Sequence, residues 1–276
     1  MHKEPVSVTQ TEIVTLEEEA SDVLSEILLE EYTSEKYDYG CQTPEECTCE
    51  YCDCEECIYP PPRLPMVALT FDDGPSQYTE YILDILKMYN ARATFCVVGN
   101  RIEDWPNTIR RAVCLGNEVI GHSWDHTNFS RLNADQIASQ ILDTSAAIEA
   151  ITGFPPPPIF RAPYGRLTST VRSTSRELGY SILNWSIDPK DWRYRDPEHI
   201  YNFIMENVRD GSIVVLHDIR PYTSEAMTRV IPGLIENGFQ LVTASELLEY
   251  FHGELEPGHE YARGPTLVDY QTQNIQ

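Results

Sequence analysis

From residue 66 onward, short apolar runs alternate with longer segments in which apolar residues recur every three or four positions. The short runs predict strands and the longer, amphipathic segments predict helices. Seven strands are expected, at residues 66–72, 93–98, 118–122, 159–163, 181–187, 212–217 and 239–243. Seven helices are expected, at residues 78–89, 105–115, 134–151, 169–178, 197–208, 225–237 and 245–251, the sixth interrupted by Pro232.

Strict alternation of strand and helix implies that neighbouring strands are parallel, because each parallel pair needs a crossover element between its members. Seven or eight such units in a chain of this length favour closure into a barrel over an open sheet. The predicted fold is therefore α/β, a TIM-like (β/α) barrel of about seven units. After residue 252 the pattern gives way to a polar segment that contains Gly and Pro, and we expect a tail at 253–276.

Charge separates the first part of the chain from the rest. Residues 1–57 carry 17 acidic residues and two lysines, a net charge of −15, whereas residues 58–276 have a net charge of −9. Pro60, Pro61 and Pro62 stiffen the junction. We therefore expect four segments: an acidic helix or spacer at 1–40, a cysteine-rich segment and proline linker at 41–62, the main domain at 63–252, and the tail.

The acidic segment contains one stretch with helical periodicity. Its apolar residues recur at three- and four-residue spacing: Ile13, Leu16, Ala20, Val23, Leu24, Ile27 and Leu28. Such a helix could dock on a partner or on the main domain, or it could be a solvated spacer with a Glu-rich face. The spacer is the favoured interpretation.

Six of the eight cysteines fall within 17 residues: Cys41, Cys47, Cys49, Cys52, Cys54 and Cys57. Six cysteines allow 15 disulfide pairings, among which the sequence does not choose. The pairs at 49/52 and 54/57 have the spacing of half a thiolate metal site. A small disulfide-stapled segment of an exported protein is favoured, because the stretch has almost no apolar residues with which to build a core. Cys96 and Cys114 lie in apolar patterns and are expected to be buried thiols.

The overall net charge of −24 argues against nucleic acid or an anionic membrane surface as a partner. No apolar run reaches 18 residues, so no transmembrane segment is expected. No basic, apolar export signal begins the chain, so any extracellular or cell-surface location has to be inferred from other features.

Polar residues follow five of the predicted strands, in the order TFDDGP, HSWDH, RAPYG, DPKDW and LHD. If the barrel forms, these segments converge at the carboxyl ends of its strands, where TIM-like barrels place their chemistry. His122 and His126 are four residues apart, so on a helical turn they would face the same way. With Asp73 they would form a two-histidine, one-carboxylate metal site, a common arrangement for catalytic zinc.

In their order and completeness, these five motifs resemble those of the polysaccharide deacetylases, the NodB-homology domain of carbohydrate esterase family 4. The resemblance covers about residues 64–251. It implies a distorted (β/α)7 barrel and a divalent metal, usually Zn2+ but also Co2+, Ni2+ or Mn2+, that takes part in hydrolysing N-acetyl groups of amino-sugar polymers. By the same resemblance, Asp73, His122 and His126 hold the metal.

The resemblance also implies the remaining roles. Asp72 would be the general base, paired with Arg161. His217 would be the general acid, supported by Asp191. The backbone N–H of Tyr164 would stabilise the oxyanion. Trp192 and Val215, the latter where the family has Leu, would line the pocket for the acetyl methyl group; by strand alternation Val215 faces the same way as His217.

The resemblance leaves the polymer open. Peptidoglycan N-acetylglucosamine is the favoured substrate, and chitin oligomers, poly-N-acetylglucosamine and acetylated xylan are alternatives. Two rival classes are a carbohydrate-binding module on an inactive scaffold, and a metal or redox module in the cysteine-rich segment with the barrel as its carrier. Asp188 and Asp218 are expected to be structural neighbours of the site and are assigned no chemical step. An extracellular or cell-surface location is expected from the substrate class and the cysteine density.

Overall fold

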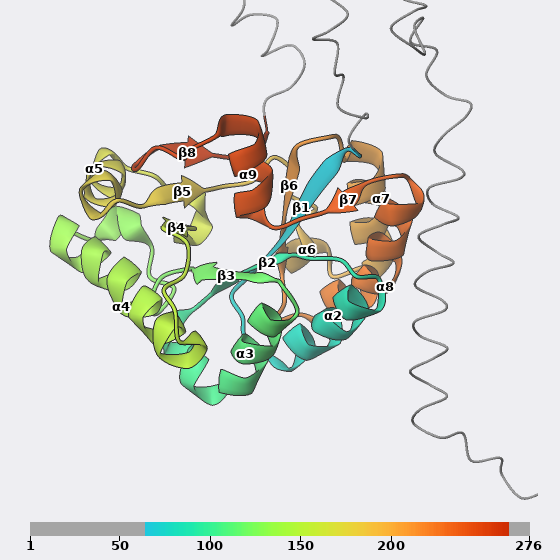
Figure 1. The fold of residues 1–276 in the computed structure, drawn as a ribbon, viewed down its shortest axis with the longest axis horizontal. Coiled ribbons are helices and arrows are strands. Elements are labelled where there is room, and N and C mark those ends of the chain that lie inside the picture. The colour runs from blue at the N-terminus through green and yellow to red at the C-terminus, as the bar shows by residue number, and fades with distance from the viewer. Residues whose placement is uncertain (1–63, 265–276) are drawn as a thin grey trace, which may run out of the picture. The chain divides into compact units, whose positions relative to one another are not determined.

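The computed structural model describes residues 64–264, in which one mixed α/β domain is built around a curled sheet (Figure 1). The sheet order is β6-β1-β2-β3-β4-β5-β8, all neighbours are parallel, and β7 pairs with the start of β1. The strands are β1 (Met66–Asp72), β2 (Thr94–Val97), β3 (Glu118–Gly121), β4 (Ile159–Phe160), β5 (Ser181–Leu183), β6 (Ser212–His217), β7 (Gln240–Leu241) and β8 (Glu260–Tyr261).

Helices surround the sheet in chain order, as the colour gradient in Figure 1 shows. They are α2 (Gln77–Met88), α3 (Pro106–Cys114), α4 (Ala134–Thr152), α5 (Ser169–Leu178), α6 (Asp191–Tyr194), α7 (Pro197–Asn207), α8 (Pro221–Glu236) and α9 (Ala244–His252). Short 3-10 turns η2 (Gly99–Asp104), η3 (Phe129–Arg131) and η4 (Pro163–Gly165) follow β2, β3 and β4. The helices contact one another in the sequence α7, α8, α2, α3, α4, α5, which is the outer layer of a barrel.

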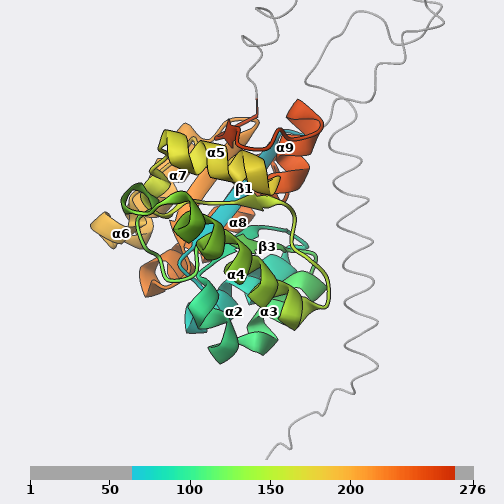
Figure 2. The same cartoon turned by 90° about the vertical axis from the view of Figure 1, so that its left-hand side faces the viewer.

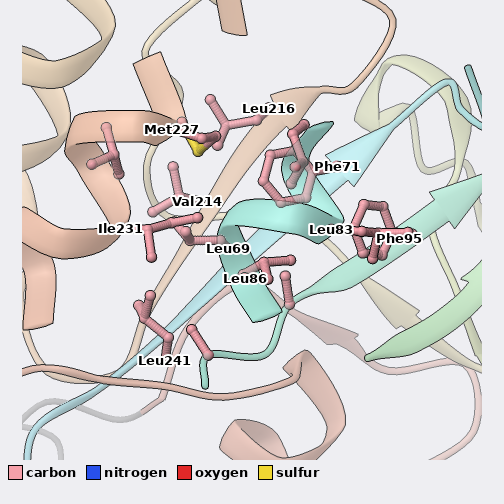
Figure 3. Packing of buried hydrophobic residues seen from close by; sticks show 14 of the residues in the cluster. Leu69, Phe71, Leu83, Leu86, Phe95, Val214, Leu216, Met227, Ile231 and Leu241 are labelled. Carbon is pink, nitrogen blue, oxygen red and sulfur yellow. The ribbon is translucent and has the colours of Figure 1, made fainter. Parts of the chain in front are cut away.

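Strand alternation divides the hydrophobic residues between two main cores. Leu69, Phe71, Val214 and Leu216 pack outward against α2 and α8, and Figure 3 shows this cluster with Met227 of α8. The intervening residues of the same strands, such as Ala68 and Ile213, face the barrel interior with Leu247 and Leu248 of α9. Helix α9 therefore fills the amino-terminal end of the barrel, and the carboxyl ends of the strands are left for polar residues.

The barrel closes incompletely. Isolated bridges join β6 to the opposite end of the sheet: Ile187, after β5, pairs with Val214 in parallel, and Arg263, after β8, pairs with Ser212 antiparallel. The predicted distorted (β/α)7 barrel is confirmed, and all seven predicted strands are present. An eighth strand, β8, pairs with β5 in residues that were expected to belong to the tail. A two-residue strand is too short to leave a periodic signal, and the burial of Tyr261 anchors it.

Three further expectations were wrong. Helix α8 begins at Pro221, four residues before the expected start. It also runs through Pro232 without interruption, because buried residues on both sides of the proline hold the helix against the sheet. This packing lets the helix tolerate an internal proline, which costs about 3 kcal/mol in an unsupported helix. Cys114 is exposed at the end of α3, whereas Cys96 is buried as expected.

The predictions for residues 1–62, namely the acidic helix, the cysteine-rich segment and the proline linker, lie outside the described residues. So does the end of the predicted tail from residue 265 onward. Within residues 64–264, no helix has both the length and the apolar composition needed to cross a bilayer.

Candidate metal centre and active site

Asp73, His122 and His126 are brought together at the carboxyl ends of β1 and β3. Oδ1 of Asp73 lies 3.1 Å from Nε2 of His126 and 3.6 Å from Nε2 of His122. One potential ligand atom from each residue lies within 4.8 Å of the other two. Among the described residues this is the group of His, Cys, Asp and Glu side chains that could hold a metal ion.

The two histidines are placed by a loop, not by the helical turn that their spacing suggested. Residues 122–128 form bends after β3, and both Ser123 and His126 have left-handed backbone conformations, with φ of 69° and 62°. The backbone N–H of His126 donates to Oγ of Ser123 at 2.9 Å, which fixes the loop. Asp73 also has a positive φ, 74°. Left-handed non-glycine residues are costly and concentrate at functional sites, as they do here.

The donor set fits a divalent cation. Oδ1 of Asp73 is buried and accepts no hydrogen bond within residues 64–264, since the contact with His126 lacks hydrogen-bond geometry. Nδ1 of His122 lies 2.9 Å from the carbonyl oxygen of Arg161, so this nitrogen carries the proton and Nε2 presents its lone pair. Burial raises the pKa of Asp73, but the neighbouring imidazoles of His126, His122 and His217 outweigh it and keep that pKa well below its usual range. An ionised carboxylate and two imidazole lone pairs are the ligands of a catalytic zinc-type site.

Beside this centre, Asp72 forms a buried ion pair. Nη1 of Arg161 donates to Oδ1 of Asp72 at 2.7 Å and to Oγ1 of Thr70 at 2.7 Å, while Nη2 donates to the backbone oxygen of Asn184 at 3.1 Å. Burial alone would raise the pKa of Asp72. The charge of Arg161, followed by those of His122 and His217, outweighs burial and lowers this pKa, so the carboxylate stays ionised. Its second oxygen lies 3.8 Å from Nε2 of His122.

His217 ends β6 and stands next to Asp72 in the parallel register between β6 and β1. Its Nδ1 lies 2.7 Å from Oδ1 of Asp191, and its backbone N–H donates to Oδ2 of the same carboxylate at 2.9 Å. Oγ1 of Thr223, in the first turn of α8, also donates to Oδ2. Burial alone would lower the pKa of His217, but the hydrogen bond and charge of Asp191 raise it to about 9.

The predicted pocket residues lie around these groups. Tyr164 follows β4 with φ of 62°, and its exposed ring meets the ring of His126 edge to face at 4.8 Å. Trp192 is 48% exposed in α6, directly after Asp191. Val215 is buried on β6, and its neighbours Val214 and Leu216 belong to the outer core, so Val215 faces inward with His217 as the alternation predicts.

Asp218, for which the sequence indicated no role, supports the loop that carries Asp73. The side chain is fully buried, and its Oδ2 accepts from Oγ1 of Thr79 at 2.5 Å. Its backbone oxygen accepts from Oγ of Ser76, the N-cap of α2, at 2.5 Å. Burial, followed by the negative charge of Asp73, raises the pKa of Asp218 to about 7. Its position directly after His217 was visible in the sequence, but its partners are about 140 residues away in the chain.

The same contact makes Gly74 sensitive to substitution. A Cβ atom at residue 74 would lie 2.3 Å from Oδ2 of Asp218, and the carboxylate has no room to retreat because it is fully buried. We expect Gly74→Ala to displace the loop of Asp73 and to weaken metal binding by about 10–100-fold, the usual loss when an outer partner of a metal ligand is changed. Titration of the stripped variant with Zn2+ measures this. Gly153→Ala is the control: its φ of 87° strains the backbone, but a Cβ there meets nothing within 4 Å. Equal affinities in the two variants would contradict the prediction.

Comparison with known proteins agrees with this site. A family model described as polysaccharide deacetylase matches residues 60–183. A peptidoglycan-N-acetylglucosamine deacetylase of Bacillus cereus is 35% identical over 198 residues, which cover 70% of this chain and 92% of that protein. The chain belongs to the polysaccharide deacetylase family.

Two other members of this deacetylase family show its range. The peptidoglycan-N-acetylmuramic acid deacetylase PdaC of Bacillus subtilis is 39% identical over 189 residues, covering 68% of this chain but 40% of that protein. The matched part of this chain therefore spans about two fifths of the full length of PdaC. A solved family 4 acetyl xylan esterase from Clostridium thermocellum, in complex with a cobalt ion, has a TM-score of 0.68 and 34% identity over 73% of this chain and all of that one.

Proposed function

We propose that this protein is a metal-dependent polysaccharide deacetylase that hydrolyses N-acetyl groups of N-acetylglucosamine in peptidoglycan. The observation that carries the proposal is the joint arrangement at the strand ends. Within the described residues, the buried Oδ1 of Asp73 accepts no hydrogen bond, and it faces two imidazoles. Beside it lie a carboxylate kept ionised by Arg161 and an imidazole kept protonated by Asp191. That combination contains a cation site, a base and an acid within one set of strand ends.

A divalent ion held by Asp73, His122 and His126 would supply Lewis acidity, polarising the acetyl carbonyl and lowering the pKa of a water molecule. We take Zn2+ as the physiological ion, because two imidazoles and one carboxylate suit it, with Co2+, Ni2+ and Mn2+ as alternatives. The cobalt ion in the related acetyl xylan esterase structure supports a divalent metal without selecting zinc.

Asp72 is placed to accept the proton of the attacking water. Its lowered pKa keeps it ionised at neutral pH, and the bond from Arg161 fixes one oxygen, which leaves the other turned toward the metal centre. Arg161 is itself held by Thr70 and by the backbone of Asn184, so the base cannot rotate away. A positioned base of this kind contributes about 10²–10⁴-fold to the rate of such a step.

His217 is placed to complete the reaction. Its Nδ1 is engaged by Asp191, so Nε2 is the nitrogen free to give its proton to the sugar nitrogen as the C–N bond breaks. The products are acetate and a free amine, and the proton taken by Asp72 balances the one donated. The backbone N–H of Tyr164 is proposed to stabilise the oxyanion, and Trp192 and Val215 to surround the acetyl methyl group.

The pH profile should depend on Asp191. His217 acts as an acid only while protonated, so with a pKa of about 9 the activity should fall as the pH rises through 9. Asp191→Asn removes the charge that raises this pKa and leaves the burial that lowers it, so we expect the basic limb of kcat/KM to move below pH 8. The pH dependence of kcat/KM on N-acetylglucosamine oligomers measures it. A basic limb that stays in place would show that another group is the acid.

The sugar specificity is part of the proposal. One compared relative is named for N-acetylglucosamine and another for N-acetylmuramic acid, both in peptidoglycan. We favour N-acetylglucosamine, and N-acetylmuramic acid is the second candidate because the more similar of these two relatives is named for it. Chitin oligomers and acetylated xylan would use the same chemistry on other polymers.

Two other functions are less well supported. A carbohydrate-binding module on an inactive scaffold would not need the ion pair of Asp72 with Arg161 or the contact of Asp191 with His217, and both are formed. A metal or redox module formed by the cysteines at 41–57 remains a hypothesis about residues outside the described range. Mass measurement before and after thiol alkylation would distinguish bridged from free sulfurs there.

The proposal includes action outside the cell or at its surface. It is supported by the substrate, a cell-wall polymer, and by the density of cysteines between residues 41 and 57. Detection of the protein in culture supernatant or in washed wall fractions would test it.

The function itself is tested by acetate release. Protein stripped with a chelator and then supplied with Zn2+ or Co2+ should release acetate from N-acetylglucosamine oligomers and from peptidoglycan, and the stripped protein should not. Reloaded protein that binds one equivalent of metal and releases acetate from neither substrate would refute the proposed function.

A further inference from the structure

Three basic side chains project from the turn that links β5 to α7. Lys190, Arg193 and Arg195 are all exposed, within and beside the single turn of α6. This basic cluster is notable because residues 58–276, to which it belongs, have a net charge of −9. Figure 2 shows α6 at the edge of the domain, projecting beyond the neighbouring helices. We call these three residues the basic turn.

The acidic residues of the same stretch neutralise it only in part. Asp188 and Asp196 each accept the backbone N–H two residues further along, at 2.8 and 3.0 Å. Asp191 is buried and directed at the imidazole of the proposed acid. Glu198 forms an ion pair with Arg229 of α8. Within residues 64–264, no member of the basic turn forms an ion pair within 4 Å. Asp191 and Glu198 are matched by His217 and Arg229, so the three cations face only Asp188 and Asp196 and the turn keeps one excess positive charge.

The basic turn is held in a defined conformation. Lys190 and Arg195, which flank α6, both adopt left-handed backbone conformations, with φ of 54° and 55°. Glycine or asparagine occupies such positions at lower cost, so cations are unusual there. The guanidinium of Arg193 lies 5.8 Å from the ring of Tyr194, which in turn packs 4.0 Å from the ring of His199. The turn is therefore ordered before any ligand binds, which lowers the entropic cost of recognition.

The basic turn also adjoins the reaction centre. Helix α6 begins at Asp191, whose Oδ1 is 2.7 Å from Nδ1 of His217. One helical turn advances about 5.4 Å, so the Cα atoms of the three basic residues lie within about one turn of Asp191. A glycan strand whose acetamide occupies the metal centre would thus pass these cations with its neighbouring sugars. In peptidoglycan alternate sugars bear a lactyl carboxylate or a peptide with carboxylates, whereas chitin and xylan backbones are uncharged.

We propose that Lys190, Arg193 and Arg195 form a subsite for carboxylates on the sugar next to the one being deacetylated, and that this subsite selects peptidoglycan over neutral acetylated glycans. The inference rests on the proposed function and names its substrate class from this chain's own charges. Arginine suits the role because its planar fork matches a carboxylate in two-point contact.

The test compares one variant on three substrates. Lys190→Gln, Arg193→Gln and Arg195→Gln are combined, and kcat/KM is measured on a neutral N-acetylglucosamine tetramer, on a tetrasaccharide alternating N-acetylglucosamine and N-acetylmuramic acid with free lactyl carboxylates, and on the same tetrasaccharide with its peptides. We expect about a ten-fold loss on the anionic substrates, in line with three exposed ion pairs, and less than a two-fold change on the neutral tetramer. Loss on both anionic substrates assigns the lactyl carboxylate, and loss only with peptides assigns the peptide carboxylates.

A matched control removes the same three charges elsewhere. Lys87, Arg110 and Arg176 are exposed on α2, α3 and α5, and their combined change to Gln should leave all three substrates unaffected. Added salt should slow the wild-type protein on anionic substrates and spare the neutral one. Equal losses on all substrates, no loss on any, or the same loss in the control would each overturn the subsite. Failure of the wild type to release acetate from any substrate would instead refute the proposed function.

Discussion

Asp73→Ala should abolish both metal binding and deacetylation. Its Oδ1 is the buried, donor-free oxygen that faces His122 and His126, and without it two neutral imidazoles remain to hold a doubly charged ion. We expect zinc content after dialysis to fall to the background level. Turnover should fall by more than the roughly 100-fold that changes in the outer partners of metal ligands cause. Metal analysis and acetate release on the same preparation give both numbers.

The control for this variant is Asp125→Ala. Asp125 lies between the two histidines in the same motif, but it is exposed and its carboxylate accepts the backbone N–H of Thr127. It should therefore keep stoichiometric zinc and most of its activity. If Asp73→Ala retained a full equivalent of metal together with its turnover, the assignment of the metal ligands would be wrong.

Asp72→Asn should give the opposite combination, bound metal without turnover. The amide keeps the shape of the side chain but cannot accept the proton from water, so we expect kcat to fall by about 10²–10⁴-fold. The buried Arg161 also loses its counter-charge, which costs up to about 3–5 kcal/mol when a buried pair is broken. Zinc content, kcat and the free energy of unfolding in urea should be measured together, so that a folding defect is not mistaken for a chemical one.

Glu118→Gln is the matched control for Asp72→Asn. It is the same change at another buried acid, at the start of β3 and away from the strand ends that carry the site. Burial raises the pKa of Glu118, and within residues 64–264 no ion pair holds its carboxylate, so Gln at this position breaks no buried charge pair. This variant should retain kcat and lose little stability. Equal losses of kcat in the two variants would show that buried acids matter only for folding, and Asp72 would lose its role as base.

The sequence led to most of the fold because its strands and helices have clear periods. Every strand and helix predicted from residue 66 onward is present, because each long helix buries one face and each strand is a short apolar run. Elements too short to show a period were missed, such as the single turn α6 and the two-residue strand β8. Pro232 misled for the opposite reason: a local rule about helices was outweighed by packing around it.

The candidate site was predicted in its members but not in its local geometry. The ordered motifs placed the residues proposed as metal ligands, base and acid, with their partners, at strand ends, and the structure brings these residues together there. The helical turn expected for His122 and His126 is a loop with left-handed residues, because backbone conformations of that kind are set by contacts such as the bond from His126 to Ser123. The support from Thr223 and Asp218 was missed, because those contacts join residues far apart in the chain.

By itself, then, the sequence determined the order of the elements, the parallel barrel that this order requires, and the residue types of one metal and acid–base site. These follow from periodicity and from motifs, which are local properties of the chain. Only the tertiary structure decided that Oδ1 of Asp73 lacks a donor among the described residues. It also decided which acids of the 188–198 segment are already engaged, and therefore where positive charge faces the solvent. Those facts depend on distances between residues that the chain brings together only when it folds, and burial then fixes the charge that each group carries.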